Sequence, residues 1–170
     1  MVFFVPVFIL GLLVTISLAD LDPKYQKPQN VSAVSYAGIE PSSCGASSFS
    51  VLTGQGAISP DDCMAIMDGW VVEGDFVLLA TGWVSSTGDA DHFYIYETQG
   101  TCQFAFERID AMQNDVNIGS SDLIKVVYNS IHMQGGSQNQ NTTIQPVEGV
   151  MDCNSTSGDA QVEWTIRKTF

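Results

Sequence analysis

The sequence has few basic side chains. Lysine and arginine together number six against nineteen aspartate and glutamate residues, so the formal net charge at pH 7 is −13. The six basic residues form no cluster. Such a surface repels phosphate backbones and anionic lipid headgroups, so we expect no nucleic-acid partner and no direct binding to a membrane surface.

The first 19 residues have no charged side chain at all. They form an apolar run ending in Ser17 and Ala19, the small residues that a signal peptidase accepts before its cut. An uncleaved membrane anchor is the alternative, because the run is just long enough to span a bilayer. The small residues at the end of the run and its missing basic flanks favour cleavage, so residues 1–19 are predicted to be a signal peptide and the mature protein to be secreted, extracellular and monomeric.

About 150 residues follow this leader, enough for one domain around a single core. Residues 20–41 contain three prolines and show no clear periodicity, so they are predicted to be a flexible N-terminal segment. Residues 42–170 are predicted to form the folded domain.

Cysteine is scarce but even in number, and all four residues lie beyond the leader: Cys44, Cys63, Cys102 and Cys153. They form no C-x-x-C pair, which disfavours zinc binding and thioredoxin-type chemistry. Asp61 and Asp62 would raise the pKa of a thiol at Cys63, the opposite of what a nucleophile needs. In an oxidising compartment we therefore expect two disulfides.

Apolar periodicity predicts two amphipathic helices. The first begins at Ser59, where Ser59 and Asp62 approximate a capping box, and ends near Glu73. Its predicted inward stripe is Cys63, Ile66, Met67, Trp70 and Val71. The second begins near Ser120, and its predicted stripe is Ile124, Val127, Tyr128 and Ile131.

Alternating apolar residues predict strands over residues 75–81, a hairpin over 92–108 that turns at Gln99–Gly100, and two strands within 143–153 and 160–168. A short strand is also expected around Phe49 and Val51. Two amphipathic helices bury both stripes by packing on one face of an antiparallel sheet, so the fold class is α+β, a two-layer sandwich.

The predicted faces suggest how the cysteines pair. Cys63 lies on the inward stripe of the first helix, and Cys102 shares a strand face with Phe104 and Phe106. If these faces pack together the two thiols meet, leaving Cys44 to pair with Cys153. Three connectivities remain formally possible.

No known catalytic, metal or nucleotide motif is found, so we expect no enzyme activity, cofactor or metal. Asp89, Asp91 and His92 match no calcium loop and are interpreted as a solvated turn. His132 is expected to interact with the end of the second helix. Trp70 and Trp164 lie on core stripes, whereas Trp83 is the tryptophan most suited to ligand contact.

Three N-x-S/T sequons are candidate glycosylation sites: Asn30, Asn141 and Asn154. The first two lie in polar segments. Asn154 adjoins a predicted disulfide cysteine, which could hinder a glycan.

Four segments, "SSCGASSF…SPDDCMAI", "GTCQFAFE", "IGSSDLIKVVYNSI" and "GVMDC…VEWTI", resemble the successive motifs of a family of fungal secreted effectors. These are effectors of the extracellular-protein-two type, also called necrosis-inducing factors. The similarity covers residues 42–168 and all four cysteines in order. It implies virulence activity on plant cells, including necrosis, and a relation to small killer toxins with an α/β sandwich. It carries over no catalytic residues, and a sequon frequent after the first cysteine of family members is missing here.

Three functions follow as hypotheses. The first is an effector that binds an extracellular host protein and induces necrosis in responsive plants. The second is an antimicrobial protein, similar to a killer toxin, that acts on a membrane channel or transporter of competing microbes. The third is a small extracellular hydrolase with a carboxylate pair.

Overall fold

The computed structural model describes residues 32–37, 42–73, 76–81, 93–110, 115–135, 143–156 and 158–169. In chain order, these residues form β1 (Ser32–Ala37), β2 (Ser50–Val51), α1 (Pro60–Glu73), β3 (Phe76–Thr81), β4 (Tyr94–Gln99), β5 (Cys102–Arg108), β6 (Val116–Gly119), α2 (Ser120–His132), β7 (Val147–Ser155) and β8 (Gly158–Lys168).

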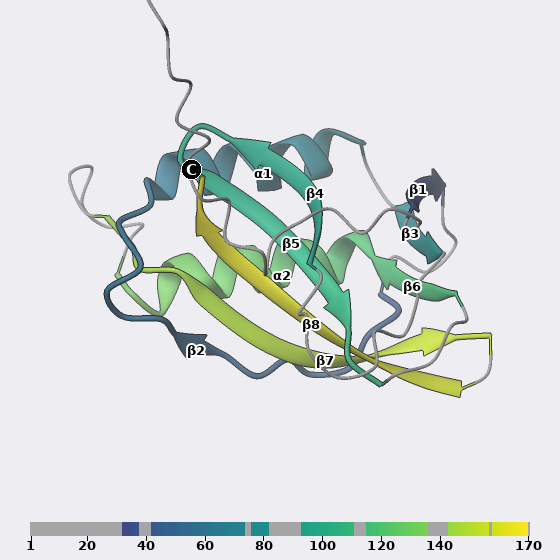
Figure 1. The fold of residues 1–170 in the computed structure, drawn as a ribbon. Coiled ribbons are helices and arrows are strands. Elements are labelled where there is room, and N and C mark those ends of the chain that lie inside the picture. Colours follow the sequence, from purple (N-terminus) through teal and green to yellow (C-terminus); the bar gives the residue numbers. More distant parts are fainter. Residues whose placement is uncertain are drawn as a thin grey trace, which may run out of the picture.

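The described strands form a single antiparallel sheet in the order β1-β3-β6-β7-β8-β5-β4, and β2 pairs with β7. Its centre is the long β7–β8 hairpin, in which Val147 faces Ile166 and Ser155 faces Gly158. Strand β5 pairs with β8 from Cys102 to Arg108. Figure 1 shows α1 and α2 on one side of this sheet, so the predicted α+β two-layer architecture is confirmed.

The core lies between the helices and the facing side of the sheet. Trp70 of α1 is 2% exposed and packs edge-on against Phe104 with ring centroids 5.5 Å apart. Trp164 of β8 is fully buried, which confirms that both tryptophans are core residues. None of the helices in the described part of the chain is long and apolar enough to cross a membrane.

The two helical stripes differ in part from those predicted. On α1, Cys63, Ile66 and Trp70 are buried, but Val71 is 58% exposed. On α2 the prediction was offset by about one residue: Tyr128 is 46% exposed, and the buried side chains are Ser120, Asp122, Leu123, Val126, Val127, Ser130 and Ile131. Periodicity indicates roughly how wide an apolar stripe is. A residue at the edge of the stripe, such as Val71 or Tyr128, can still lie on the exposed side.

Two strands were not predicted. Strand β1 lies inside the segment expected to be flexible, and it pairs with β3 from Ser32 to Ala37. Strand β6 has only four residues and pairs mainly with β3. Strand β6 is too short to show a clear alternation, and β1 lies in a proline-containing segment without clear periodicity, so long-range pairing with β3 decides whether they form.

Both predicted disulfides form. Cys63 of α1 bonds Cys102 of β5 inside the core, where these residues are 0% and 1% exposed. Cys44 bonds Cys153 of β7, its directly opposite neighbour in an isolated β-bridge. The Cys63–Cys102 bond joins residues 39 positions apart in the chain, and the Cys44–Cys153 bond joins residues 109 positions apart. In the chain-entropy account each bond stabilises the fold by about 4–5 kcal/mol.

The first turn of α1 is attached to the β4–β5 turn through Asp62. Its carboxylate accepts hydrogen bonds from the amide and the hydroxyl of Thr101, each at 2.7 Å. The Ser59 amide donates to the Thr101 hydroxyl at 2.9 Å. The predicted capping box is therefore wrong. In such a box the Ser59 amide would donate to the Asp62 carboxylate, but here the amide donates to Thr101 and the carboxylate accepts from Thr101. Gly100 permits this contact, since a Cβ atom there would lie 2.5 Å from the Asp62 carboxylate.

Gly149 of β7 is required by the packing around Trp164. These residues face each other across β7 and β8. A Cβ atom at residue 149 would overlap the Ser48 carbonyl oxygen and lie 2.5 Å from the Trp164 ring. The indole thus occupies the space that any side chain would need.

We predict that Gly149→Ala lowers the free energy of unfolding by about 1–3 kcal/mol, because the methyl group displaces the Trp164 ring or the Ser48 backbone. Urea denaturation would measure the loss. Gly69→Ala, on the exposed side of α1 with nothing near its Cβ position, is the matched control and should gain up to about 1 kcal/mol. Equal effects of the two substitutions would contradict this account of Gly149.

We also predict that the Asp62 contact is lost in acid. The hydrogen bonds from the Thr101 hydroxyl and amide lower the pKa of Asp62 below its ordinary value of 3.8. A carboxylate whose pKa is lower in the folded state stabilises the fold above its unfolded pKa, and this stabilisation disappears as the pH falls through the folded pKa. Asp62→Asn should therefore be less stable than wild type at pH 7, and the difference should shrink below about pH 4.

Urea denaturation at pH 7 and pH 3 measures this difference. The control is Asp61→Asn, which removes an exposed carboxylate from the same helical turn. If Asp61→Asn reproduces the whole effect, the helix dipole and not Thr101 is responsible.

Candidate functional site

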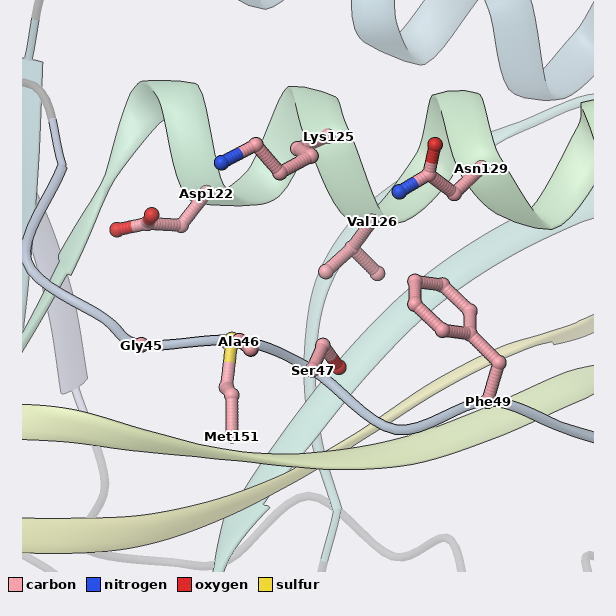
Figure 2. Close-up of a pocket in the computed structure, with 9 residues that line it drawn as sticks. All are labelled: Gly45, Ala46, Ser47, Phe49, Asp122, Lys125, Val126, Asn129 and Met151. Carbon is pink, nitrogen blue, oxygen red and sulfur yellow. The ribbon is translucent and has the colours of Figure 1, made fainter.

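A groove separates α2 from the chain segment that precedes β2, and its volume is about 230 Å³. Figure 2 shows the helix on one side, this segment on the other and Met151 of β7 below. The lining residues are Gly45, Ala46, Ser47, Phe49, Asp122, Lys125, Val126, Asn129 and Met151.

The wall opposite α2 is held against β7 by backbone hydrogen bonds. The amide of Gly45 donates to the Asp152 carbonyl at 2.8 Å, and the amide of Ser48 donates to the Val150 carbonyl at 3.0 Å. The Cys44–Cys153 disulfide fixes the beginning of this wall. The segment is therefore a structured part of the domain.

Trp164 supports the same wall from inside the core. Its indole Nε1 donates to the Ser47 hydroxyl at 2.6 Å, which satisfies the one polar atom of a fully buried ring. Phe49 packs edge-on against the indole, with ring centroids 5.2 Å apart. The Phe49 ring consequently projects into the groove towards Val126 (Figure 2).

Asp122 joins this wall to the helix. The residue is only 5% exposed, and its carboxylate accepts four hydrogen bonds. The donors are the Ser42 hydroxyl at 2.8 Å and the amides of Ser43 at 2.6 Å, Cys44 at 2.9 Å and Gly119 at 3.2 Å. The charge also lies in the first turn of α2, where the helix dipole favours an anion.

The outer rim of the groove is formed by Lys125 and Asn129, which lie one turn apart on α2. Both are exposed, and neither side chain makes a hydrogen bond or ion pair with another residue in the described part of the chain. Figure 2 shows both side chains at the groove. Their ammonium and amide groups are available to a partner.

Apart from the buried Asp122, no acidic side chain is among the described residues that line the groove. Residues 42–59 contain no charged side chain, and the one acidic residue of α2 is the buried Asp122. The net charge of −13 is therefore carried elsewhere, and Lys125 is the exposed charge at this site.

The candidate residues from the sequence are placed as follows. His132 lies at the end of α2, where its Nδ1 donates a hydrogen bond to the Tyr128 carbonyl at 2.9 Å and its ring stacks on the Tyr128 ring with centroids 3.7 Å apart. Asn154 of β7 is exposed, whereas its neighbour Cys153 is buried, so the two side chains are not on the same face. Outside the described residues lie Asn30, Asn141, Trp83, Asp89, Asp91 and His92.

The groove is suited to binding. The Asp122 carboxylate already accepts four hydrogen bonds, and none of the described residues that line the groove is a histidine. Within the described ranges, no three histidine, cysteine, aspartate or glutamate side chains gather as they would around a metal ion.

Sequence reasoning did not identify Asp122, Lys125 or Asn129. Asp122 offered one signal, an acidic residue in a first helical turn directly after two serines. The signal pointed to helix capping, which the Gly119 amide confirms, but the other three donors, residues 42–44, lie almost 80 residues earlier in the chain and could not be foreseen.

Comparison with known families gives one match. The model of the Hce2 family, described as "pathogen effector; putative necrosis-inducing factor", matches residues 43–153. The matched region begins one residue before Cys44 and ends at Cys153, so it contains both disulfides, α1, α2 and the groove. No curated protein matches the chain.

We predict that Asp122→Asn destabilises the protein by about 1–3 kcal/mol, because an amide oxygen cannot replace a carboxylate that accepts four buried hydrogen bonds. Limited proteolysis should then cut within residues 42–49 sooner than in wild type. Asp68→Asn on the exposed side of α1 is the control and should change neither measurement. Unchanged stability in the Asp122 variant would mean that the disulfide and the hydrogen bonds to β7 hold this segment without the Asp122 carboxylate.

Proposed function

This chain belongs to the Hce2 family of pathogen effectors, and from that premise we propose that it is secreted, acts on a plant host target outside the cell and induces necrosis in responsive hosts. The observation that carries the proposal is the family match, which covers the disulfide-bonded part of the domain from end to end.

The protein acts, in this proposal, by binding and not by catalysis. Lys125 and Asn129 offer hydrogen-bond donors that have no partner among the described residues, whereas the Asp122 carboxylate already accepts four hydrogen bonds. Support also comes from the charge, because a protein with a net charge of −13 is poorly attracted to anionic bilayers. In this proposal cell death therefore begins with binding to a protein target and not with disruption of a bilayer. The signal peptide over residues 1–19 belongs to the same proposal.

The two disulfides suit this mode of action. All four cysteines are paired, so no thiolate is available for chemistry. The cross-links limit unfolding and hence the exposure of cleavable backbone, which is useful in a compartment rich in proteases. Activity should depend on the fold and not on a reactive cysteine.

The test is infiltration of the purified, oxidised mature protein into leaves of several plant genotypes, scored for necrosis. We expect necrosis in some genotypes, unchanged after treatment of the native protein with an alkylating agent. Replacing Cys63 and Cys102 together by alanine should weaken both necrosis and resistance to proteolysis, because the core cross-link is lost.

Two outcomes would contradict the proposal. Loss of activity after alkylation of the folded protein would show that a thiol takes part. Necrosis in no genotype, together with inhibited growth of competing fungi, would favour the killer-toxin type of function.

A further inference from the structure

The size of the groove limits what can fill it. Sites that enclose a whole small molecule usually measure about 300–1,000 Å³, whereas this groove measures about 230 Å³. A volume below that range suits one side chain that protrudes from a larger partner. Anchor side chains of this kind supply much of the free energy of binding at protein interfaces.

The lining determines the chemistry of that side chain. Phe49, Val126 and Met151 give the interior an apolar surface, and the Phe49 ring offers a face or edge to another ring. The methionine adds a flexible, polarizable wall that adapts to an inserted group. An aromatic or large aliphatic anchor therefore fits the interior.

The positive charge of Lys125 at the rim favours a negatively charged group next to the anchor side chain of the partner. The ammonium of Lys125 and the amide of Asn129 both lie at the edge of the groove without a partner among the described residues. The nearby Asp122 carboxylate does not compete with an incoming carboxylate for the Lys125 ammonium, because it already accepts four hydrogen bonds from other groups. A carboxylate from the partner would complete the rim.

Exposed apolar side chains also lie on α2, directly after it and on β2. Tyr128 of α2 is 46% exposed, Met133 at the C-cap of that helix is 52% exposed, and Val51 of β2 is 36% exposed. Tyrosine and methionine are enriched at protein interfaces, and charged residues are depleted at interface centres. Neither α2 nor residues 42–59 carry an exposed carboxylate.

We propose that the groove between α2 and residues 45–49 binds an extracellular protein through an apolar anchor side chain adjacent to a carboxylate. The anchor inserts between Phe49, Val126 and Met151, and the carboxylate pairs with Lys125. This inference rests on the proposed function only in that the partner is the target of the effector, and it concerns a site that can be tested without any plant assay.

The probe is a set of three capped dipeptides, acetyl-Trp-Asp-amide, acetyl-Trp-Asn-amide and acetyl-Ala-Asp-amide, titrated into the oxidised mature protein and followed by amide chemical shifts. We expect shifts centred on Ala46, Lys125 and Asn129. The Trp-Asp peptide should bind about two- to five-fold more tightly than the Trp-Asn peptide, the range for one exposed ion pair. The Ala-Asp peptide should bind more weakly still, because it lacks the anchor.

Lys125→Glu should abolish or reverse the preference for the Trp-Asp peptide. Lys168→Glu is the matched control, because it makes the same charge change at an exposed lysine of β8 that does not line the groove. It should keep the preference. Amide spectra of both variants show whether they remain folded.

Three results would overturn the proposal: equal binding of the Trp-Asp and Trp-Asn peptides, shifts centred away from the groove, or the same loss in both lysine variants. The same loss in both lysine variants would show that the net charge of the protein alone determines its preference for the Trp-Asp peptide. Failure of the proposed function is seen separately, as a lack of necrosis with wild-type protein, and it would leave the titration result standing.

Discussion

Four hydrogen bonds to the Asp122 carboxylate hold together parts of the chain that are far apart in sequence. Three donors come from residues 42–44 and one from Gly119, so the beginning of the domain is fixed to the first turn of α2. The Cys44–Cys153 disulfide fixes the same residues to β7. The segment leading to β2 is thereby positioned between helix and sheet, and the groove exists because of that placement.

The two disulfides stabilise different parts of the molecule. Cys63–Cys102 joins the helical layer to the sheet inside the core, near the attachment of the α1 first turn to the β4–β5 turn. Cys44–Cys153 joins the start of the domain to its central hairpin at a position that is partly exposed. Together they hold a small domain in one shape.

The charge of the protein gains meaning from its distribution. A net charge of −13 by itself describes a protein that avoids anionic partners. The described structure adds that α2 and residues 42–59 carry no exposed carboxylate and that Lys125 lies at the rim of the groove. Electrostatic complementarity of this local kind sets the specificity and the association rate of a complex more than its affinity.

The fold class, the long strands, the two helices and the presence of two disulfides could be predicted from the sequence, because each depends on local periodicity or on a count of cysteines. The predicted faces favoured one of three possible disulfide pairings, and the structure confirmed it. Tertiary structure alone decided the rest. Whether Tyr128 or Leu123 is buried depends on how α2 is rotated against the sheet. Strand β1 depends on pairing with β3, and β6 depends on pairing with β3 and β7. Asp122 looked like a helix cap, and Lys125 and Asn129 like ordinary surface residues. Their common site arises because residues 42–49 fold back almost 80 positions along the chain, a long-range contact that leaves no periodic pattern in the sequence.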